Sequence, residues 1–353
     1  MTYAADWQSI DAAEAGFAPD LADRLADAWS AGRPPGLHGV VVIRHGRLVL
    51  ERYGAGEDFS WNESLGWVTF GPDTLHDLRS VTKSVVGLLY GIALAAGRVP
   101  GPDEPLYRHF PEYPDLAADS RRAEITVEHA LTMTLGLEWD ESAPYTSTAN
   151  SEIAMETAPD RFRFILERPI VEAPGTRWRY SGGASALLGR LIARGTGQPL
   201  QEFARNALFE PLGIRRLGWL AGRDGVAAAA SGLRLAPRDL ARIGQTVLDR
   251  GRWSGREVVP AAWLDEALRP HVQMDNGLEY GYQWYLGALP SPAGESAAPL
   301  QWVGAMGNGG QRLIVVPERA LIVAITAGNY NSPAGSTTPA TVLNDVILPS
   351  LRP

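Results

Sequence analysis

The sequence predicts an α+β fold: an antiparallel sheet flanked by helices, with an all-α region inserted. Three observations lead to this prediction. Strand-like segments occur near both ends of the chain, helix-like segments separated by proline and glycine fill its middle, and 45% of the 353 residues are hydrophobic. If strands from both ends share one sheet, the middle of the chain must leave that sheet and return to it. We therefore expect a discontinuous sheet domain, residues 1–99 and 228–353, around a mostly helical domain, residues 100–227.

The first elements are a helix and a hairpin. Residues 19–31 have helical character, and two apolar runs, residues 39–43 and 48–50, flank the turn of residues 44–47. Two short apolar runs around a tight polar turn predict a β-hairpin. Residues 56–76 are rich in aromatic side chains and predict a loop.

A long apolar helix follows the loop. Residues 85–96 are apolar nearly all round, which indicates a buried helix. The middle of the chain then alternates helical segments with proline and glycine. Its clearest predicted helices are residues 127–133, 160–167, 184–194 and 200–208.

The last third changes from helices to strands. Two further helices are predicted at residues 237–250 and 260–268, and a closing helix at residues 338–351. Residues 289–299 predict a surface loop. Between these elements, an antiparallel meander is predicted from residues 280–286, 301–306, 311–316 and 321–326, with residues 317–320 forming its last turn.

The composition excludes several classes of partner. A net charge of -8 argues against general affinity for nucleic acid or an anionic membrane. The chain has no cysteine, so disulfides, thiolate metal sites and cysteine nucleophiles are excluded. Residues 1–17 do not resemble a secretory signal, and no apolar run approaches the roughly 20 residues of a membrane span. We expect a cytoplasmic protein that acts on a small molecule, without cofactor or metal; its oligomeric state is left open.

The most informative residue is Lys83, the only lysine among 32 lysine and arginine side chains. It stands three residues after Ser80, so both share one face of the predicted helix. A desolvated lysine can give up its proton, whereas arginine stays charged. The S-x-x-K spacing therefore predicts a serine nucleophile with a lysine base.

Such a pair needs a second proton carrier and two oxyanion donors. Tyr180, in a loop before the helix of residues 184–194, is the candidate carrier, although tyrosines in such places are often packing residues. The backbone N–H of Ser80, at a helix N-terminus, is one candidate donor. The second is the N–H of Asn308, in a glycine-rich segment, residues 307–310, that is also typical of a hairpin turn.

These segments, in this order, resemble the serine β-lactamase and penicillin-binding-protein superfamily. The nearest branch is the class C-type fold, with family VIII carboxylesterases and 6-aminohexanoate-dimer hydrolases. The resemblance covers roughly residues 37–326 and implies a β-lactamase/transpeptidase-like fold with the active site between the two domains. It also implies an acyl-enzyme on Ser80, activated by Lys83 and Tyr180. Substrate contacts are expected at Gly307, Gly309, Tyr145 and Asn150, and supporting stretches are residues 126–137, 174–189 and 210–214.

Two departures from the family pattern bear on the substrate. The Tyr-x-Asn motif of β-lactamases corresponds to Tyr180-Ser181-Gly182, which lacks the amide. Their Lys-Thr-Gly motif corresponds to Ala305-Met306-Gly307, or less well to Trp302-Val303-Gly304, and both lack the cation that holds a substrate carboxylate. Small carboxylic esters or linear amides are thus favoured over β-lactams and D-alanyl peptides.

Competing chemistries have little support. No G-x-S-x-G elbow is present, and no Lys-Ser or Lys-Thr follows the glycines of residues 307–310 to make a phosphate loop. The six histidines have no metal-binding spacing. The alternative from another class is a catalytically silent binding protein on the same fold.

Overall fold

The computed structural model describes residues 7–291 and 298–352. Its centre is an eight-stranded sheet with the order β10-β11-β12-β13-β14-β15-β1-β2, in which all neighbours are antiparallel. The predicted α+β fold, an antiparallel sheet flanked by helices, is confirmed. The strands are β1 (Leu37–Arg44), β2 (Arg47–Tyr53), β10 (Val272–Gln273), β11 (Glu279–Tyr280), β12 (Tyr285–Leu289), β13 (Leu300–Gly307), β14 (Gln311–Val316) and β15 (Leu321–Ala327).

The central strands contain uninterrupted apolar runs because both faces of the sheet are covered. In β1, Val41 and Ile43 join one hydrophobic core, while Val40 and Val42 join the core on the opposite face. The alternation follows from the two-residue period of a strand.

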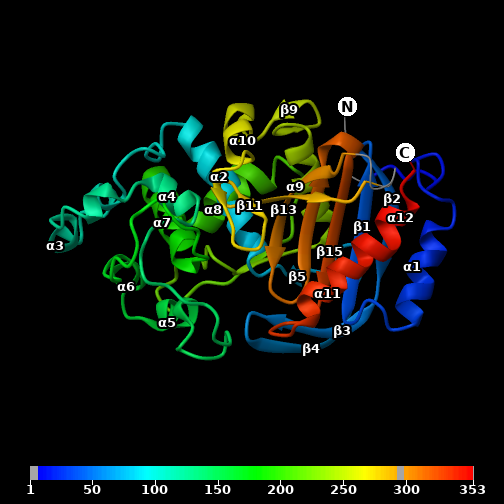
Figure 1. The fold of residues 1–353 in the computed structure, drawn as a ribbon, viewed down its shortest axis with the longest axis horizontal. Coiled ribbons are helices and arrows are strands. Elements are labelled where there is room, and N and C mark those ends of the chain that lie inside the picture. The colour runs from blue at the N-terminus through cyan, green and yellow to red at the C-terminus, as the bar shows by residue number, and fades with distance from the viewer. Residues whose placement is uncertain (1–6, 292–297, 353) are drawn as a thin grey trace.

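Helices cover both faces of the sheet (Figure 1). On one face lie α2 (Val81–Ala95) and α9 (Pro237–Leu248); on the other lie α1 (Leu21–Ser30) and α11 (Ala334–Thr341). The remaining helical segments are η1 (Leu106–His109), α3 (Pro114–Ala117), η2 (Arg122–Glu124), α4 (Val127–Leu131), α5 (Ser151–Thr157), α6 (Arg161–Leu166), α7 (Gly182–Thr196), α8 (Leu200–Ala204), η3 (Arg205–Phe209), α10 (Ala261–Ala267), η4 (Pro317–Arg319), η5 (Val342–Ile347) and α12 (Leu348–Ser350).

The mostly helical middle of the chain lies beside the sheet (Figure 1). Its helix α7 packs against α2, so α2 contacts both this region and the sheet. A residue at the start of α2 can therefore reach groups from both regions. The division at residues 99 and 227 stays a prediction. None of the helices in the described ranges is long and apolar enough to cross a lipid bilayer.

Some predicted elements differ from the structure. The expected loop of residues 56–76 is wrong, because it contains a hairpin of β3 (Ala55–Ser60) and β4 (Glu63–Thr69), whose glycines weaken the strand pattern. The predicted strand of residues 280–286 is interrupted between β11 and β12. Part of the loop expected at residues 289–299 lies outside the described residues. Short strands that were not predicted are β5 (His76–Asp77), β6 (Gly218–Trp219), β7 (Leu233–Leu235), β8 (Arg252–Trp253), β9 (Arg256–Glu257) and β10.

Candidate active site

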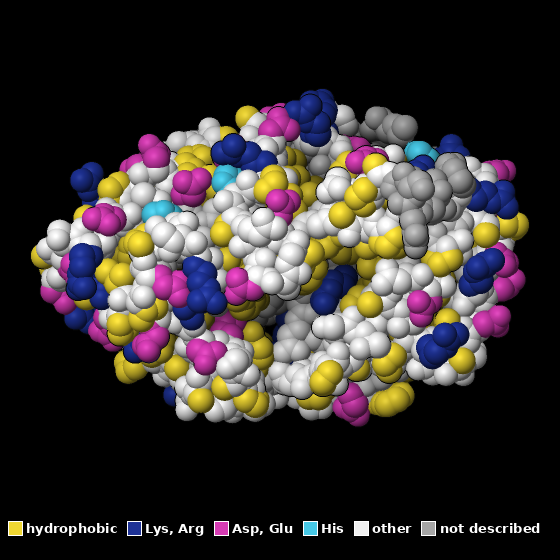
Figure 2. All heavy atoms as spheres, in the orientation of Figure 1, with side chains coloured by type: hydrophobic (Ala, Val, Ile, Leu, Met, Phe, Trp, Pro, Cys, Tyr) yellow, Lys and Arg dark blue, Asp and Glu magenta, His cyan; other side chains and the backbone are white. Residues whose placement is uncertain are grey.

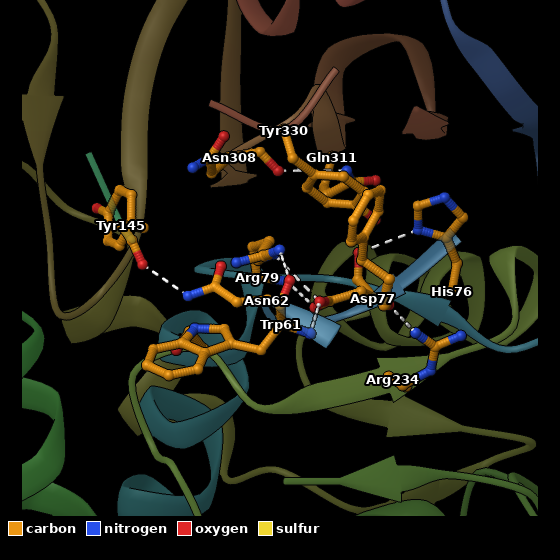
Figure 3. A network of polar contacts seen from close by, with 12 residues as sticks. Trp61, Asn62, His76, Asp77, Arg79, Tyr145, Arg234, Asn308, Gln311 and Tyr330 are labelled. Carbon is orange, nitrogen blue, oxygen red and sulfur yellow. Dashed lines mark hydrogen bonds and ion pairs between the residues drawn. The ribbon is translucent and has the colours of Figure 1, made fainter. Parts of the chain in front are cut away.

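The turn that presents Ser80 is held by a buried ion pair. Arg79 has φ +48°, a left-handed conformation that costs a non-glycine residue on the order of 1–3 kcal/mol. Asp77 compensates: its Oδ1 accepts the Arg79 N–H at 3.0 Å, and its Oδ2 lies 3.1 Å from Arg79 Nε. The guanidinium also lies 4.6 Å from the ring centre of Tyr330 (Figure 3). These contacts fix Ser80 at the N-cap of α2.

The structure brings Lys83 to Ser80. Lys83 Nζ lies 3.1 Å from Ser80 Oγ and donates to the carbonyl of Ala230 at 2.8 Å. The side chain is only 2% exposed. The neighbourhood expected from the i, i+3 spacing is therefore present, and the amine is shielded from bulk water.

Tyr180 lies beside Ser80 and Lys83. Its ring centre is 4.7 Å from Lys83 Nζ, and its phenol forms a side-chain hydrogen bond with Ser80. Burial, followed by the negative charges of Glu141 and Glu152, raises the pKa of Tyr180 well above its usual value, although the Ser80 contact lowers it. The phenol is thus a proton donor at neutral pH.

The two arginines closest to Tyr180 in the sequence do not promote its ionisation. Arg177 pairs with Asp275 at 3.2 Å, and Arg179 pairs with Glu172. Neither guanidinium is among the groups that set the pKa of the phenol, because acidic partners hold both elsewhere.

The end of β13 forms the other side of the site. Gly307 is required there, because a Cβ would lie 2.3 Å from the carbonyl oxygen of Leu78. Asn308 follows, and its side chain is held by two hydrogen bonds of 2.8 Å with Asn331. Gly307, Asn308 and Gly309 all line the pocket that contains Ser80, whereas Gly304 does not, which favours placing the third motif at residues 305–307.

The two candidate oxyanion donors are available. Within the described residues, no hydrogen bond engages the backbone N–H of either Ser80 or Asn308. Unpaired N–H groups beside a pocket suit the negative oxygen of a tetrahedral intermediate. The arrangement fits acyl transfer.

The pocket has a volume of about 400 Å³ and also includes Tyr145, Trp178 and Tyr285. Figure 2 shows the hollow in this face of the molecule, with a basic side chain visible inside it. The hydroxyl of Tyr145 donates to Glu141 at 2.7 Å, and its carbonyl accepts from Asn62 of the β3–β4 turn at 2.6 Å (Figure 3). Tyr145 therefore lines the pocket, and its contact with a substrate stays a prediction.

Asn150 has a different role from the one expected. Its side chain is fully buried and caps α5, accepting from the N–H groups of Glu152 and Ile153. Its amide donates to the carbonyls of Glu141 and Ala143. Because these bonds use its polar atoms and it does not line the pocket, the expectation that Asn150 contacts substrate is wrong.

Sequence reasoning missed two carboxylates near Lys83, the half-buried Glu141 and the fully buried Glu152. Glu141 accepts hydrogen bonds from Trp139 Nε1 and the Gly182 N–H, both at 2.6 Å. Glu152 Oε2 lies 3.7 Å from Lys83 Nζ. Burial, followed by the charge of Glu152, raises the pKa of Glu141 to about 7, while Lys83 lowers it.

Sequence reasoning also missed a cation in the pocket. Arg312, on β14, lines the pocket and donates to the carbonyls of Gly307 and Gln311. No carboxylate in the described chain pairs with it. Burial lowers its pKa, as expected for a guanidinium without an anionic partner. The third motif lacks a cation, as expected from the sequence, but the next strand supplies one to the pocket.

Among the residues that the structure describes, one cluster could hold a metal ion. Glu128, Glu266 and His271 bring ligating atoms within 4.8 Å of one another. The hydroxyl of Tyr282 donates to Glu128 at 2.7 Å, and its ring stacks on His271. These contacts explain the cluster without a metal, and none of its residues lines the pocket of Ser80.

Comparison with known proteins agrees with this geometry. The sequence model of the beta-lactamase family matches residues 21–344. The chain belongs to the beta-lactamase family. This family of hydrolases includes esterases and amidases.

Its relatives have several different activities. The chain is 30% identical to esterase EstB of Burkholderia gladioli over 51% of its own length, and 24% identical to the 6-aminohexanoate-dimer hydrolase of Paenarthrobacter ureafaciens over 71%. It spans only 46% and 60% of these relatives. A beta-lactamase of Escherichia coli K12 is 25% identical, with 77% of this chain and 80% of that protein covered.

Solved structures share the fold. The hydrolase EstCE1, which has promiscuous acyltransferase activity, superposes with a TM-score of 0.69 at 18% identity, covering 91% of this chain and 98% of its own. An octameric penicillin-binding protein homologue from Pyrococcus abyssi gives 0.67 at 18% identity, covering 95% and 79%. At this identity the likeness shows the fold alone.

Proposed function

We propose that this protein is a serine hydrolase that cleaves small carboxylic esters or linear amides through an acyl-enzyme. The observation that carries the proposal is the convergence of Ser80, Lys83 and Tyr180 beside two unpaired N–H groups in one pocket. Relatives named esterase EstB and 6-aminohexanoate-dimer hydrolase support the substrate class.

The geometry supports a division of roles. Ser80 Oγ attacks the substrate carbonyl and transfers its proton to the neutral amine of Lys83, 3.1 Å away. The N–H groups of Ser80 and Asn308 stabilise the oxyanion. Tyr180, which the raised pKa keeps protonated, gives a proton to the leaving group as the tetrahedral intermediate collapses. It regains one from the Lys83 ammonium, and water then attacks the acyl-enzyme by the reverse sequence.

A substrate screen tests the proposal. We expect short-chain p-nitrophenyl esters to be cleaved with higher kcat/KM than a chromogenic cephalosporin, because the second motif lacks the amide of Tyr-x-Asn. Linear amides complete the panel. Comparable efficiency on esters and cephalosporin would contradict the esterase assignment.

Arg312 favours a second candidate function, hydrolysis of substrates that carry a carboxylate, such as β-lactams or D-alanyl peptides. A guanidinium that lines the pocket without a carboxylate partner can bind such a group. A charged hydrogen bond of this kind contributes about 1.5–3 kcal/mol, or roughly tenfold or more in binding.

Arg312→Gln separates the two candidates. With p-nitrophenyl hydrogen adipate, which carries a free carboxylate, we expect KM to rise about tenfold. With the neutral p-nitrophenyl hexanoate of equal chain length, we expect little change, so this ester is the control. Equal effects on both esters would mean that Arg312 supports the pocket wall and does not select anions.

A further inference from the structure

Glu152 is the carboxylate that forms an ion pair with the catalytic lysine. It lies on α5, is 0% exposed, and its Oε1 accepts from the hydroxyl of Ser231 at 2.6 Å. Its Oε2 has no hydrogen-bond partner in the described chain and lies 3.7 Å from Lys83 Nζ. This distance is that of an ion pair, so the carboxylate acts on the lysine through its charge.

The surroundings of Lys83 suit an ammonium group. A protonated lysine has three N–H donors. Ser80 Oγ and the Ala230 carbonyl lie at 3.1 and 2.8 Å, and the Glu152 carboxylate lies in a third position. A buried ammonium without an anion would be costly, and Glu152 supplies that anion.

The departure in the second motif makes room for this carboxylate. Gly182 stands where Tyr-x-Asn has its asparagine, and a Cβ at this position would lie 2.8 Å from Glu152 Oε2. A side chain at position 182 and the Glu152 carboxylate would therefore compete for the same space. Here a negative charge from a different helix takes the place of the motif's amide.

Other titratable groups face the same space. Glu141 and Glu156 interact electrostatically with both Lys83 and Glu152. Burial raises the pKa of each to about 7, although Arg161 pairs with Glu156 at 3.1 Å. Three tyrosines also face this space, all with pKa values raised by burial: Tyr145, Tyr180 and Tyr285.

We propose that Glu152 is a positioning residue for the Ser80–Lys83 pair: its carboxylate is the counter-ion of the lysine and sets the pH at which the amine becomes available as a base. The proposal rests on the proposed function. It assigns to this chain a charge partner that the family's second motif does not contain.

The direction of the effect follows from electrostatics. The Glu152 carboxylate, 3.7 Å from Lys83 Nζ, stabilises the ammonium form of the lysine relative to the neutral amine. This stabilisation favours transfer of the Ser80 proton to the amine. Without the carboxylate, the amine would accept the proton less strongly.

The experiment uses the only lysine of the chain. Protein labelled with isotopic lysine gives one side-chain signal, because the chain has one lysine. NMR can therefore measure the titration midpoint of Lys83 without resonance assignment. In Glu152→Gln we expect this midpoint to fall by about 1–3 pH units, the shift typical of losing an opposite charge at this distance. The acid limb of the pH profile of kcat/KM should move to lower pH together with this midpoint. The value of kcat on the plateau of the profile should fall.

Glu156→Gln is the matched control, since it removes a carboxylate from the same helix one turn later. Its effect on the midpoint should be distinctly smaller. An unchanged midpoint in folded Glu152→Gln, or an equal shift in both variants, would overturn the proposal.

Glu152→Asp provides the test if Glu152→Gln does not fold. It keeps the negative charge on a shorter side chain, so we expect a smaller fall in the midpoint and partial retention of kcat. An unchanged midpoint with reduced kcat would show a purely structural role. The titration needs no turnover, whereas failure of the proposed function would appear as absence of a covalent adduct on Ser80.

Discussion

Replacing Lys83 by arginine is expected to lower kcat for ester hydrolysis by about 10² to 10⁴, the range for loss of a general base. Arginine keeps the positive charge but does not deprotonate at accessible pH. It therefore preserves the charge beside Glu152 while removing the acceptor that lies 3.1 Å from Ser80 Oγ. Steady-state kinetics on a p-nitrophenyl ester measure the loss.

The control for this substitution is Arg98→Lys, an exchange between the same two residue types at an exposed position just beyond α2. It should have wild-type activity. Circular dichroism and thermal unfolding establish that Lys83→Arg is folded, since its side chain is larger and the site is buried. A folded, active Lys83→Arg would show that the Ser80 proton goes elsewhere.

Tyr180→Phe is expected to lower kcat by a similar factor, about 10² to 10⁴, because the leaving group loses its proton donor. The phenol forms its hydrogen bond with Ser80 and lies over Lys83, so removing the hydroxyl leaves the packing of the ring in place. KM should change much less than kcat.

An ester with a better leaving group distinguishes this role from packing. A leaving group that departs without protonation needs no acid, so Tyr180→Phe should lose less activity on a p-nitrophenyl ester than on an alkyl ester of the same acid. Tyr53→Phe, which removes a hydroxyl bound to Glu51 outside the pocket, is the control. Wild-type turnover of both esters by Tyr180→Phe would show that Tyr180 only packs in the site and does not donate a proton.

The sheet could be predicted because its main strands carry local signals. β1, β14 and β15 each contain an uninterrupted apolar run, buried on both faces of the sheet. The β3–β4 hairpin had no such signal. Its strands are partly exposed and contain glycine, and its turn uses a left-handed Trp61, a conformation that non-glycine residues seldom adopt.

The residues of the candidate site likewise fall into those that local sequence signals predict and those that depend on the tertiary structure. Ser80 and Lys83 are one helical turn apart, so sequence spacing alone places them together. Tyr180 and Asn308 were expected from motif order, and both line the pocket or contact Ser80. Glu152 is distant in sequence from Lys83, and its role depends on how α5 packs against α7, which in turn packs against α2.

Arg312 shows the limit of composition as evidence. The single lysine stood out because it was rare, whereas one arginine among many carried no signal. Its position follows from the antiparallel pairing of β13 with β14, which places Arg312 opposite Met306 and beside the pocket. Motif comparison looked for a cation only in the third motif and so missed one on the next strand.

The central claim, that Ser80 is the nucleophile of an acyl-enzyme, is tested most directly by intact mass spectrometry after treatment with a fluorophosphonate probe. We expect one adduct per chain, located by peptide mapping on Ser80 and absent from Ser80→Ala. The unpaired N–H groups of Ser80 and Asn308 should stabilise the phosphonyl oxygen of this adduct. No mass increase in the folded protein, or an adduct retained in Ser80→Ala, would contradict the account and favour a binding protein on the beta-lactamase fold.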